Sequence, residues 1–381
     1  MIDFELNEEQ RMIRAAAREV VEREIAPRAA HHDETREFPW ENVRRLGEMG
    51  FMGMCVDPEH GGAGLDFLSY ILALEEVSAG CAATGVIMSV QNSLVCGPIA
   101  QFGTADQKRR YLPDLAAGKK IGAYCLTEPG AGSDAANQKT TAVKRDGRYI
   151  LNGTKMFVTN GGVADVLVVY TRTDPAAKSR GITCFLVETG FPGVDRSHRE
   201  KTMGIRGSST TEVVLKDAGV PGENLLGELN KGYSVALATL EGGRIGIAAQ
   251  AVGIARNALA EALKYAPVRE QFGHPIAEFQ AIQWMLADMA TEIEAAQLLT
   301  YRAASMRDRG ERCAKEASMA KLYASEVAVR SADRAVQIHG GYGYIQDFPV
   351  ERLYRDAKIT QLYEGTSQVQ KLVIAGSLLK E

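Results

Sequence analysis

A carboxylate near the end of the chain stands where it could do proton-transfer chemistry. Glu364 is followed at once by Gly365 and then by the hydroxyl residues Thr366 and Ser367. Ser367 and Gln370 have capping-box spacing, which predicts a helix beginning directly after the glutamate. Because glycine lets a substrate approach the backbone closely, a base here could do enolate-type chemistry. The same stretch also fits a solvated glutamate in a loop, where charged side chains usually lie.

Two segments further up the chain could hold a flat ring or phosphates. Thr127–Asp134 is rich in glycines and hydroxyls, and its backbone N–H groups could cradle phosphates or ring heteroatoms. A plain loop between two domains would have the same composition. Phe157 and Thr159 lie two residues apart on a predicted strand and would share one face. They could flank a flat heterocycle, or they could belong to the core.

Three breaks in the helical C-terminal part have a similar ambiguity. Arg269 and Phe272 put a cation and an aromatic ring beside Gly273, which could dock an adenine and its pyrophosphate or form a polar turn between helices. The segment Gln337–Gly341 could meet a phosphate or act as a flexible connector. The paired glycines of Glu241–Arg244 each cost a helix about 1 kcal/mol relative to alanine. That cost indicates close approach by a ligand or by another helix.

Several common site types have no motif in this chain. The six histidines show no H-E-x-x-H spacing, so no metal site is expected. The G-x-S-x-G pattern of many hydrolases is absent. The dinucleotide pattern G-x-G-x-x-G is absent as well, and no βαβ unit follows Thr127–Asp134.

The composition is that of a globular protein. Of the 381 residues, 45% are hydrophobic and 24% are charged. The net charge is −4 and there is no basic block, so nucleic-acid and anionic-membrane binding are not expected. No apolar run approaches the roughly 20 residues that span a bilayer, so membrane insertion is not expected. The six cysteines include no C-x-x-C pair, which fits a reducing compartment.

The first ten residues, MIDFELNEEQ, are polar and acidic. They resemble neither a signal peptide nor an Arg-rich transit peptide, so we expect a cytoplasmic, bacterial-type location. A mitochondrial matrix location would require that a transit peptide had been removed.

The residue pattern changes from helical to strand-like and back to helical, and these two changes predict three domains. Residues 1–120 read as helical, residues 121–230 as an antiparallel β domain, and residues 231–381 as a helical bundle. The fold class is therefore expected to be α+β and multidomain. Capping boxes are predicted at Asn7/Gln10 and at Thr104/Gln107.

The helical spacing and the turn signals predict individual elements. Helices are predicted over residues 8–26 (ending at Pro27), Trp40–Met49, Asp66–Ser78, Ala82–Ala100, Arg109–Leu115, Gly232–Ala266, Ala277–Arg309, Glu311–His339 and Ser367–Leu379. Strands are predicted over Val166–Tyr170, Ile182–Val187 and Thr211–Leu215. Hairpin turns are predicted at Asp146-Gly147, Asn152-Gly153 and Asn160-Gly161.

Taken together and in this order, the motifs resemble those of the acyl-CoA dehydrogenases across nearly the whole chain. The matching segments are Ala123-Tyr-Cys-Leu-Thr-Glu-Pro-Gly130, Arg269-x-Gln-Phe-Gly273, Gln337-Ile-His-Gly-Gly-Tyr-Gly343 and Leu362-Tyr-Glu-Gly-Thr-Ser-Gln368. The resemblance implies an N-terminal helical domain, a middle β domain and a C-terminal four-helix-bundle-like domain that assembles into a homotetramer. It also implies FAD as the cofactor.

The resemblance further implies which residues hold the FAD. At the flavin they would be Tyr124, Leu126, Thr127, Gly132, Ser133, Phe157 and Thr159, with Thr159 near N5. At the adenine end, across a subunit interface, they would be Arg269, Phe272, Gln280, Gln337, Gly340 and Gly341. The phosphates and ribose would be contacted by Thr366 and Gln368. Phe157 stands where tryptophan is frequent in the family.

The implied reaction is α,β-dehydrogenation of an acyl-CoA to the trans-2-enoyl-CoA. Glu364 would take the α-proton, a β-hydride would go to flavin N5, and electrons would pass to an electron-transfer flavoprotein. The Glu364 N–H and a ribityl hydroxyl would hold the enolate oxygen. Some members carry the base on a bundle helix, but the matching residue here is Gly243. The acyl-CoA would contact Ser133, Glu241, Arg244, Gln250, Thr360, Tyr363 and Gly365.

Gln250 and Thr360 resemble residues of the short-chain members, where they help to close the acyl pocket, so butyryl-CoA-like substrates are expected. Glu241 stands where aspartate is common. Gln91 and Cys96 leave branched or cyclic acyl groups open. Two alternatives are an acyl-CoA oxidase and a flavin-containing relative that acts as a binding or scaffold protein. Oxidases of this type usually carry an added C-terminal domain.

Overall fold

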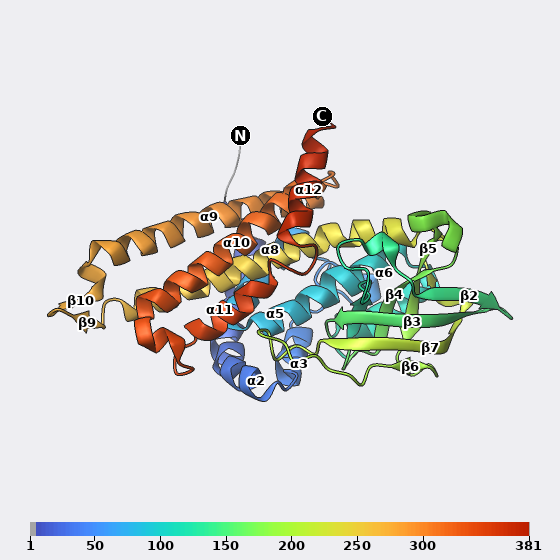
Figure 1. Ribbon diagram of the computed structural model, residues 1–381, viewed down its shortest axis with the longest axis horizontal. Coiled ribbons are helices and arrows are strands. Elements are labelled where there is room, and N and C mark those ends of the chain that lie inside the picture. The colour runs from blue at the N-terminus through green and yellow to red at the C-terminus, as the bar shows by residue number, and fades with distance from the viewer. Residues whose placement is uncertain (1–4, 381) are drawn as a thin grey trace.

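The computed structural model describes residues 5–380. Figure 1 shows an elongated molecule with the β-sheet at one end, long helices running away from it, and a small β9–β10 hairpin at the other end. Helices near the N-terminus pack beneath the long helices and against the sheet. One apolar core joins both helical regions to the sheet, and a second lies within the β region.

The N-terminal region is helical, as predicted. Its segments are α1 (Glu8–Val20), a π-helical turn (Val21–Ile25), a 3-10 turn (Ala26–Arg28), α2 (Ala29–Thr35), α3 (Trp40–Glu48), a 3-10 turn (Pro58–His60), α4 (Phe67–Gly80), α5 (Ala82–Ser89), a π-helical stretch (Val90–Cys96), α6 (Gly97–Phe102) and α7 (Ala105–Ala116). Both predicted capping boxes form, at Asn7/Gln10 and at Thr104/Gln107. The predicted helix end at Pro27 was wrong: Pro27 occupies the first turn of the 3-10 segment, where its missing N–H costs nothing, and α2 follows directly.

The helical run Ala82–Phe102 corrects the expectation about apolar runs. Its 21 residues are long and apolar enough to cross a membrane by length and composition alone. However, 89% of its most apolar window is buried inside the protein, which is the position of a core helix. This run lies beside α8 and forms one wall of the cavity described below.

The middle region is built around one eight-stranded sheet. Its strands are β1 (Gly122–Cys125), β2 (Thr141–Arg145), β3 (Arg148–Val158), β4 (Val166–Arg172), β5 (Ile182–Glu188), β6 (Val194–Asp195), β7 (Thr211–Pro221) and β8 (Leu225–Leu226). Short 3-10 turns lie at Ala135–Asn137, Pro175–Gly181 and Gly222–Asn224. The order is β6-β7-β3-β2-β4-β5-β8, with β1 beside β4. Most pairs are antiparallel, as expected, but β1 and β2 both pair with β4 in parallel.

The three predicted hairpin turns have different outcomes. Asp146-Gly147 joins β2 to β3 as a two-residue hairpin turn. Asn152-Gly153 instead lies inside β3, at an irregularity in its pairing with β7. A Cβ on Gly153 would lie 2.5 Å from the Thr140 hydroxyl oxygen, so the glycine permits close packing rather than a chain reversal. Asn160-Gly161 is a turn, but it links β3 to β4, which are not paired with each other.

The C-terminal region consists of long helices, as predicted. It contains α8 (Gly232–Tyr265), β9 (Glu270–Gln271), β10 (His274–Pro275), a 3-10 turn (Ile276–Glu278), α9 (Gln280–Asp308), α10 (Ala314–His339), a 3-10 turn (Gly340–Tyr344), α11 (Val350–Ile359) and α12 (Ser367–Leu378). Figure 1 shows α8, α9 and α10 lying side by side, with α10 packed on α8, α9, α11 and α12. Helix α11 was not predicted.

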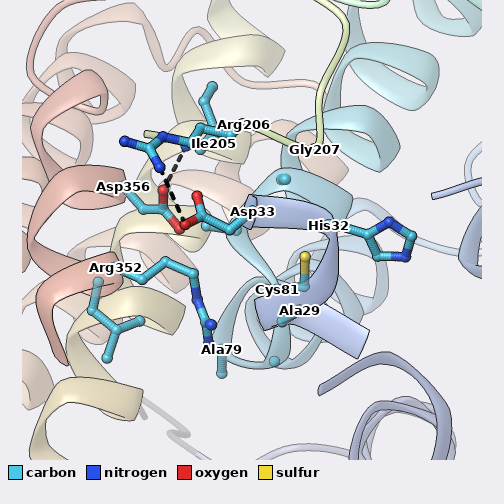
Figure 2. A pocket seen from close by; sticks show the side chains of 14 residues that line it. Ala29, His32, Asp33, Ala79, Cys81, Ile205, Arg206, Gly207, Arg352 and Asp356 are labelled. Carbon is cyan, nitrogen blue, oxygen red and sulfur yellow. Dashed lines mark hydrogen bonds and ion pairs between the residues drawn. The ribbon is translucent and has the colours of Figure 1, made fainter. Parts of the chain in front are cut away.

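Helix α11 docks on the loop that precedes β7. The Ile205 N–H donates to the Asp356 carboxylate at 2.5 Å, and a Cβ on Gly204 would meet the Arg355 backbone at 2.5 Å. Figure 2 shows Asp356 and Asp33 pointing toward one another below Ile205. Because α11 leads straight into Glu364, this contact between the β region and the bundle helps to place the turn that carries the glutamate.

Candidate functional site

Glu364 sits in a strained turn between α11 and α12. Glu364 and Gly365 both have left-handed backbone conformations, with φ of +55° and +89°. A non-glycine residue in that region costs of order 1 kcal/mol or more, and such strain concentrates at functional sites. The Glu364 backbone N–H donates to no group among residues 5–380.

The start of α12 differs from the predicted capping box. Thr366, not Ser367, is the N-cap residue, and its hydroxyl accepts from the Val369 N–H at 3.3 Å. The Gln370 amide reaches back instead to the carbonyls of Glu364 and Gly365, at 3.1 and 2.8 Å. The polar residues after Glu364 therefore hold the turn itself.

Glu364 lines a cavity of about 330 Å³ at the junction of the three regions. The apolar part of the wall comes from the core helical run, the β region, α8 and α12. The lining side chains include Val86, Val90, Leu94, Leu126, Met156, Tyr233, Leu237, Leu240, Val369 and Val373. Such a mostly apolar cavity with a few convergent polar groups is typical of a small-molecule site.

The electrostatics of Glu364 suit a base that works near neutrality. Its Oε2 atom is buried and has no hydrogen-bond partner among residues 5–380. Burial raises the pKa of this carboxyl to about 7, although Arg244 and Lys321 both act to lower it. A general base is most effective when its pKa lies near the working pH.

The paired glycines of α8 make room for this carboxylate. A Cβ on Gly243 would lie 2.2 Å from Glu364 Oε2, so any side chain there would displace the glutamate. Helix α8 runs through Gly242 and Gly243 without a break. Next to them, the buried Arg244 lines the cavity. Close approach by another group, as the sequence indicated, is therefore the reason for the glycine at 243.

The residues predicted at the flavin come together around the same cavity. Tyr124, Leu126, Thr127, Gly132, Ser133, Phe157 and Thr159 all line the cavity. Phe157 does not follow the regular strand alternation, because a bulge gives it a φ of +56° and leaves its side chain 64% exposed. It is therefore not part of the core.

A buried ion pair fixes the loop that carries Leu126 and Thr127. The Lys155 ammonium donates to Glu128 at 2.8 Å, to Gln138 at 2.9 Å and to the Leu126 carbonyl at 3.2 Å. The Glu128 carboxylate also accepts from the Thr140 N–H at 3.0 Å. All three ammonium protons are satisfied, so this charged cluster is structural and stiffens the loop from residue 126 onward.

The residues predicted at the adenine end lie elsewhere, around the β9–β10 hairpin. Figure 1 shows this hairpin at the opposite end of the molecule from the sheet. Arg269, Gly340 and Gly341 line a second cavity of about 460 Å³ there. Phe272 is 92% exposed at the tip of the hairpin, in a left-handed turn with Gly273. Gln280 and Gln337 are exposed at the start of α9 and near the end of α10.

The residues predicted at the acyl-CoA are only partly assembled. Ser133, Arg244, Tyr363 and Gly365 line the first cavity, whereas Glu241, Gln250 and Thr360 do not. Gln250 lies behind the wall: it accepts from the Tyr363 hydroxyl and donates to the Ala82 carbonyl at 2.8 Å.

Four further residues named from the sequence lie outside the lining of the first cavity. Thr360 is buried and bonds the Ala357 carbonyl at 2.7 Å. Gln91 and Cys96 are buried outside the lining, so neither shapes the cavity directly. Gln368 is exposed on the first turn of α12.

Sequence reasoning missed Lys321 and the second role of Gln370. Lys321 lies in α10 and donates to the Gly365 carbonyl at 2.6 Å. Its signal in the sequence was weak: Lys321 is spaced four residues after Ala317 and three before Ala324, on the apolar face of a helix that also carries other charged residues. Among residues 5–380, no group of three His, Cys, Asp or Glu side chains is placed to hold a metal ion.

Comparison with protein families accounts for this arrangement. Three family models match in succession: the acyl-CoA dehydrogenase N-terminal domain over residues 7–119, the middle domain over 123–218 and the C-terminal domain over 230–379. The chain belongs to the acyl-CoA dehydrogenase family, whose members are flavoenzymes that carry FAD.

Similar proteins include short-chain members of this family. The chain is 50% identical over 379 residues to the short-chain specific acyl-CoA dehydrogenase of Clostridium acetobutylicum, covering 100% of both chains. It superposes on the butyryl-CoA dehydrogenase of Megasphaera elsdenii with a TM-score of 0.97 at 46% identity, covering 99% of this chain and 100% of that one. It is also 46% identical to the caffeyl-CoA reductase-Etf complex subunit CarC of Acetobacterium woodii, covering 98% of this chain and 99% of that one.

The residues at the first cavity fit a flavin ring. The lining of the cavity includes the hydroxyl residues Thr127, Ser133 and Thr159 as well as Glu364. Gly130 and Gly132 have open space where a Cβ would point, so the backbone there could lie against a ligand. Hydroxyls and backbone N–H groups are suitable donors for the heteroatoms of such a ring.

Proposed function

We propose that this protein oxidises short-chain acyl-CoA thioesters to trans-2-enoyl-CoA, with Glu364 as the base that removes the α-proton. The observation that carries the proposal is the buried, partnerless Glu364 oxygen facing a mostly apolar cavity from a strained turn. The buried Oε2 atom of this carboxylate makes no hydrogen bond to any group among residues 5–380. A role in catalysis explains why the protein bears the cost of burying it.

The proton is acquired directly by the Glu364 carboxylate. Desolvation raises the pKa of this group to about 7, which makes it a far stronger base than an exposed glutamate. Arg244 and Lys321 supply the opposing positive charge that allows it to ionise in an apolar setting. The enolate oxygen that develops on the thioester would be held by the Glu364 backbone N–H, which the left-handed turn leaves free.

Bound FAD would supply the redox chemistry by accepting the β-hydride at its flavin ring. Tyr124, Leu126, Thr127, Gly132, Ser133, Phe157 and Thr159 would hold the flavin end. The adenine end of a neighbouring subunit's FAD would be held by Arg269, Phe272, Gln280, Gln337, Gly340 and Gly341. Thr366 and Gln368 would contact the phosphates and ribose of FAD. The separation of the two cavities supports a shared site between subunits, as in a homotetramer.

The preference for a short acyl chain rests on Tyr363 and its support. Gln250 fixes the Tyr363 hydroxyl from behind and is itself held by the Ala82 carbonyl at 2.8 Å. A ring pinned in this way closes the wall of the cavity firmly. The identity to a short-chain specific dehydrogenase and to a butyryl-CoA dehydrogenase supports the same preference.

The electron acceptor is proposed to be an electron-transfer flavoprotein. The relative that is a subunit of an Etf complex supports this partner. Use of oxygen, as in an acyl-CoA oxidase, is the rival outcome, and rapid aerobic peroxide formation with butyryl-CoA would establish it. The likeness to bacterial relatives supports a cytoplasmic location.

Anaerobic titration of the purified flavoprotein with a ladder of acyl-CoAs tests the proposal. Butyryl-CoA should bleach the flavin absorbance near 450 nm fastest, with longer, branched and cyclic acyl groups slower. Fastest bleaching by a branched or cyclic acyl-CoA would transfer the assignment to that class. No bleaching by any acyl-CoA would overturn the enzymatic proposal in favour of a binding function.

A further inference from the structure

Lys321 occupies an unusual position for a lysine. It lies in the middle of α10, and its whole side chain is buried. Its Nζ atom donates to the carbonyl oxygen of Gly365 at 2.6 Å, across 44 residues of sequence. The lysine is therefore fastened to the residue that directly follows Glu364.

In the part of the chain that the structure describes, Lys321 lacks the carboxylate partner that the other fully buried lysine, Lys155, has. Lys155 is paired with the Glu128 carboxylate at 2.8 Å. Lys321 has no carboxylate within ion-pair distance among residues 5–380. A buried ammonium without an adjacent counter-charge is costly, so its retention indicates a function.

The charged groups that face Lys321 belong to the catalytic turn and to α8. The Glu364 carboxylate acts on it from the turn, and the Arg244 guanidinium acts on it from α8. Arg244 in turn faces Glu241 and the phenol of Tyr124. Burial lowers the pKa of the Lys321 ammonium to about 7, and the Glu364 carboxylate is the anion that acts to keep it protonated.

The Gly365 carbonyl receives a second donor, the Gln370 amide at 2.8 Å. The two donors approach from different helices, α10 and α12. Together they hold the Gly365 carbonyl, which follows directly on the two left-handed residues Glu364 and Gly365. Of these two donors only Lys321 can carry a charge, so only Lys321 acts electrostatically on the neighbouring Glu364 carboxylate, as Arg244 does from α8.

We propose that Lys321 is a positioning residue for Glu364: its ammonium fixes the Gly365 carbonyl and supplies the positive charge that lets the adjacent carboxylate ionise in an apolar cavity. The inference rests on the proposed role of Glu364 as the base. It gives α10 a part in positioning the base, which the sequence did not indicate.

The first test compares Lys321→Met and Lys321→Gln with the wild type. Both variants remove the charge, and the glutamine keeps an amide donor. Ser325→Ala is the matched control, because Ser325 is buried one turn further along α10 and its hydroxyl bonds only within the helix, to the Leu322 carbonyl at 3.1 Å. FAD content and thermal midpoint establish that each variant is folded.

The readout is the rate of anaerobic flavin reduction by butyryl-CoA as a function of pH. Without the ammonium, the base should ionise at a pH higher by about one unit, which is about a tenfold loss of rate on the acidic limb. The rate should recover at high pH. A purely structural role would lower the rate equally at every pH. An unchanged pH profile in both lysine variants would overturn the proposal.

A second test needs no turnover. The thermal midpoint at pH 7, where the ammonium and the carboxylate are both ionised in part, is measured for Lys321→Met alone, for Glu364→Gln alone and for the double variant. Loss of the lysine should lower the midpoint more when Glu364 is present than when it is already neutral, because only then is a buried anion left unsupported. Equal losses in both backgrounds would contradict the inference. Failure of the wild type to be reduced by any acyl-CoA would instead contradict the proposed function, and this cycle would still measure the coupling.

Discussion

At the scale of single residues, the properties of Glu364 follow from opposing effects of comparable size. Burial raises the pKa of its carboxyl, and the cations Arg244 and Lys321 lower it again, which leaves it at about 7. Full burial without cations would keep the group protonated at neutral pH. Full exposure would make it too weak a base for an α-proton of a thioester.

This balance predicts the pH dependence of the chemical step. The base accepts a proton only when ionised, so the rate of flavin reduction by butyryl-CoA should rise with pH and reach half its maximum near pH 7. Rapid-mixing measurements between pH 5 and 9 provide the check. A midpoint near 4.5, the ordinary value for glutamate, would show that the carboxylate is not desolvated.

The neighbouring glycines of α8 give a second prediction at this scale. Gly243→Ala should place a methyl group 2.2 Å from Glu364 Oε2, displace the carboxylate and reduce the rate of flavin reduction by roughly 100-fold. Gly242→Ala is the matched control, since its methyl group meets only the flexible end of Arg307 at 3.3 Å.

Both alanines should favour the helix by about 1 kcal/mol, so the two variants differ mainly in what their methyl groups touch. FAD content and single-turnover rates are measured for each. Equal rates in both variants would mean that Glu364 does not occupy the position seen here.

At this scale the sequence was informative where function depends on neighbours in the chain. Glu364, Gly365 and Thr366 are consecutive, so their motif was visible. The contribution of Lys321 was not, because it depends on how α10 lies against the turn. Gln250 and Thr360 were expected at the pocket through resemblance, but they support Tyr363 and α11 from behind.

At the scale of elements, α11 connects the β region to the catalytic turn. Its Asp356 is buried beside Asp33, and burial raises the pKa of the Asp356 carboxyl to about 6. This folded-state pKa lies above the ordinary value of 3.8, so the folded protein favours the protonated form of Asp356. The contribution of that form to folding stability is complete below about pH 3.8 and is lost as pH rises through 6. Above pH 6 the ionised group costs the fold about 3 kcal/mol.

Asp356→Asn should remove this cost while keeping an oxygen that accepts from the Ile205 N–H. The thermal midpoint of the variant relative to wild type should therefore increase between pH 5 and pH 8. Asp356→Ala is the control: it loses the acceptor, so it should be destabilised at both pH values. A difference between Asp356→Asn and wild type that does not change with pH would contradict this account.

Elements were predicted well where local chemistry determines them. The capping boxes at Asn7/Gln10 and Thr104/Gln107 formed because each is closed within four residues. Helix α11 was missed because its sequence, VERLYRDAKI, is short and mostly polar, and its stability comes from docking on the β region. Asn152-Gly153 was misread as a turn because the packing of Gly153 on Thr140 is a tertiary contact.

At the scale of the whole molecule, the two halves of the expected cofactor site lie far apart in one chain. Figure 1 shows the β9–β10 hairpin remote from the sheet. No local signal in the sequence reports this separation, nor the parallel pairing of β1 with β4, because both depend on long-range arrangement. The resemblance to a family supplied the expectation of a site shared between subunits.

Subunit complementation tests that expectation. One chain carries Glu364→Gln, and the other carries Arg269→Ala with Phe272→Ala, so each type of homo-oligomer should be inactive or poor in FAD. Coexpressed chains should regain flavin reduction by butyryl-CoA, because mixed oligomers contain sites with one intact half from each chain. Mixtures no more active than the separate variants would place the whole FAD site within one subunit.

The most direct test of the account is single-turnover reduction of the Glu364→Gln variant by butyryl-CoA under anaerobic conditions. The variant removes the base and retains the shape of the side chain. We expect it to hold FAD, to bind the thioester with a visible perturbation of the flavin spectrum, and to show no bleaching near 450 nm over the time in which the wild type is fully reduced. Bleaching at a rate close to that of the wild type would show that another group removes the α-proton.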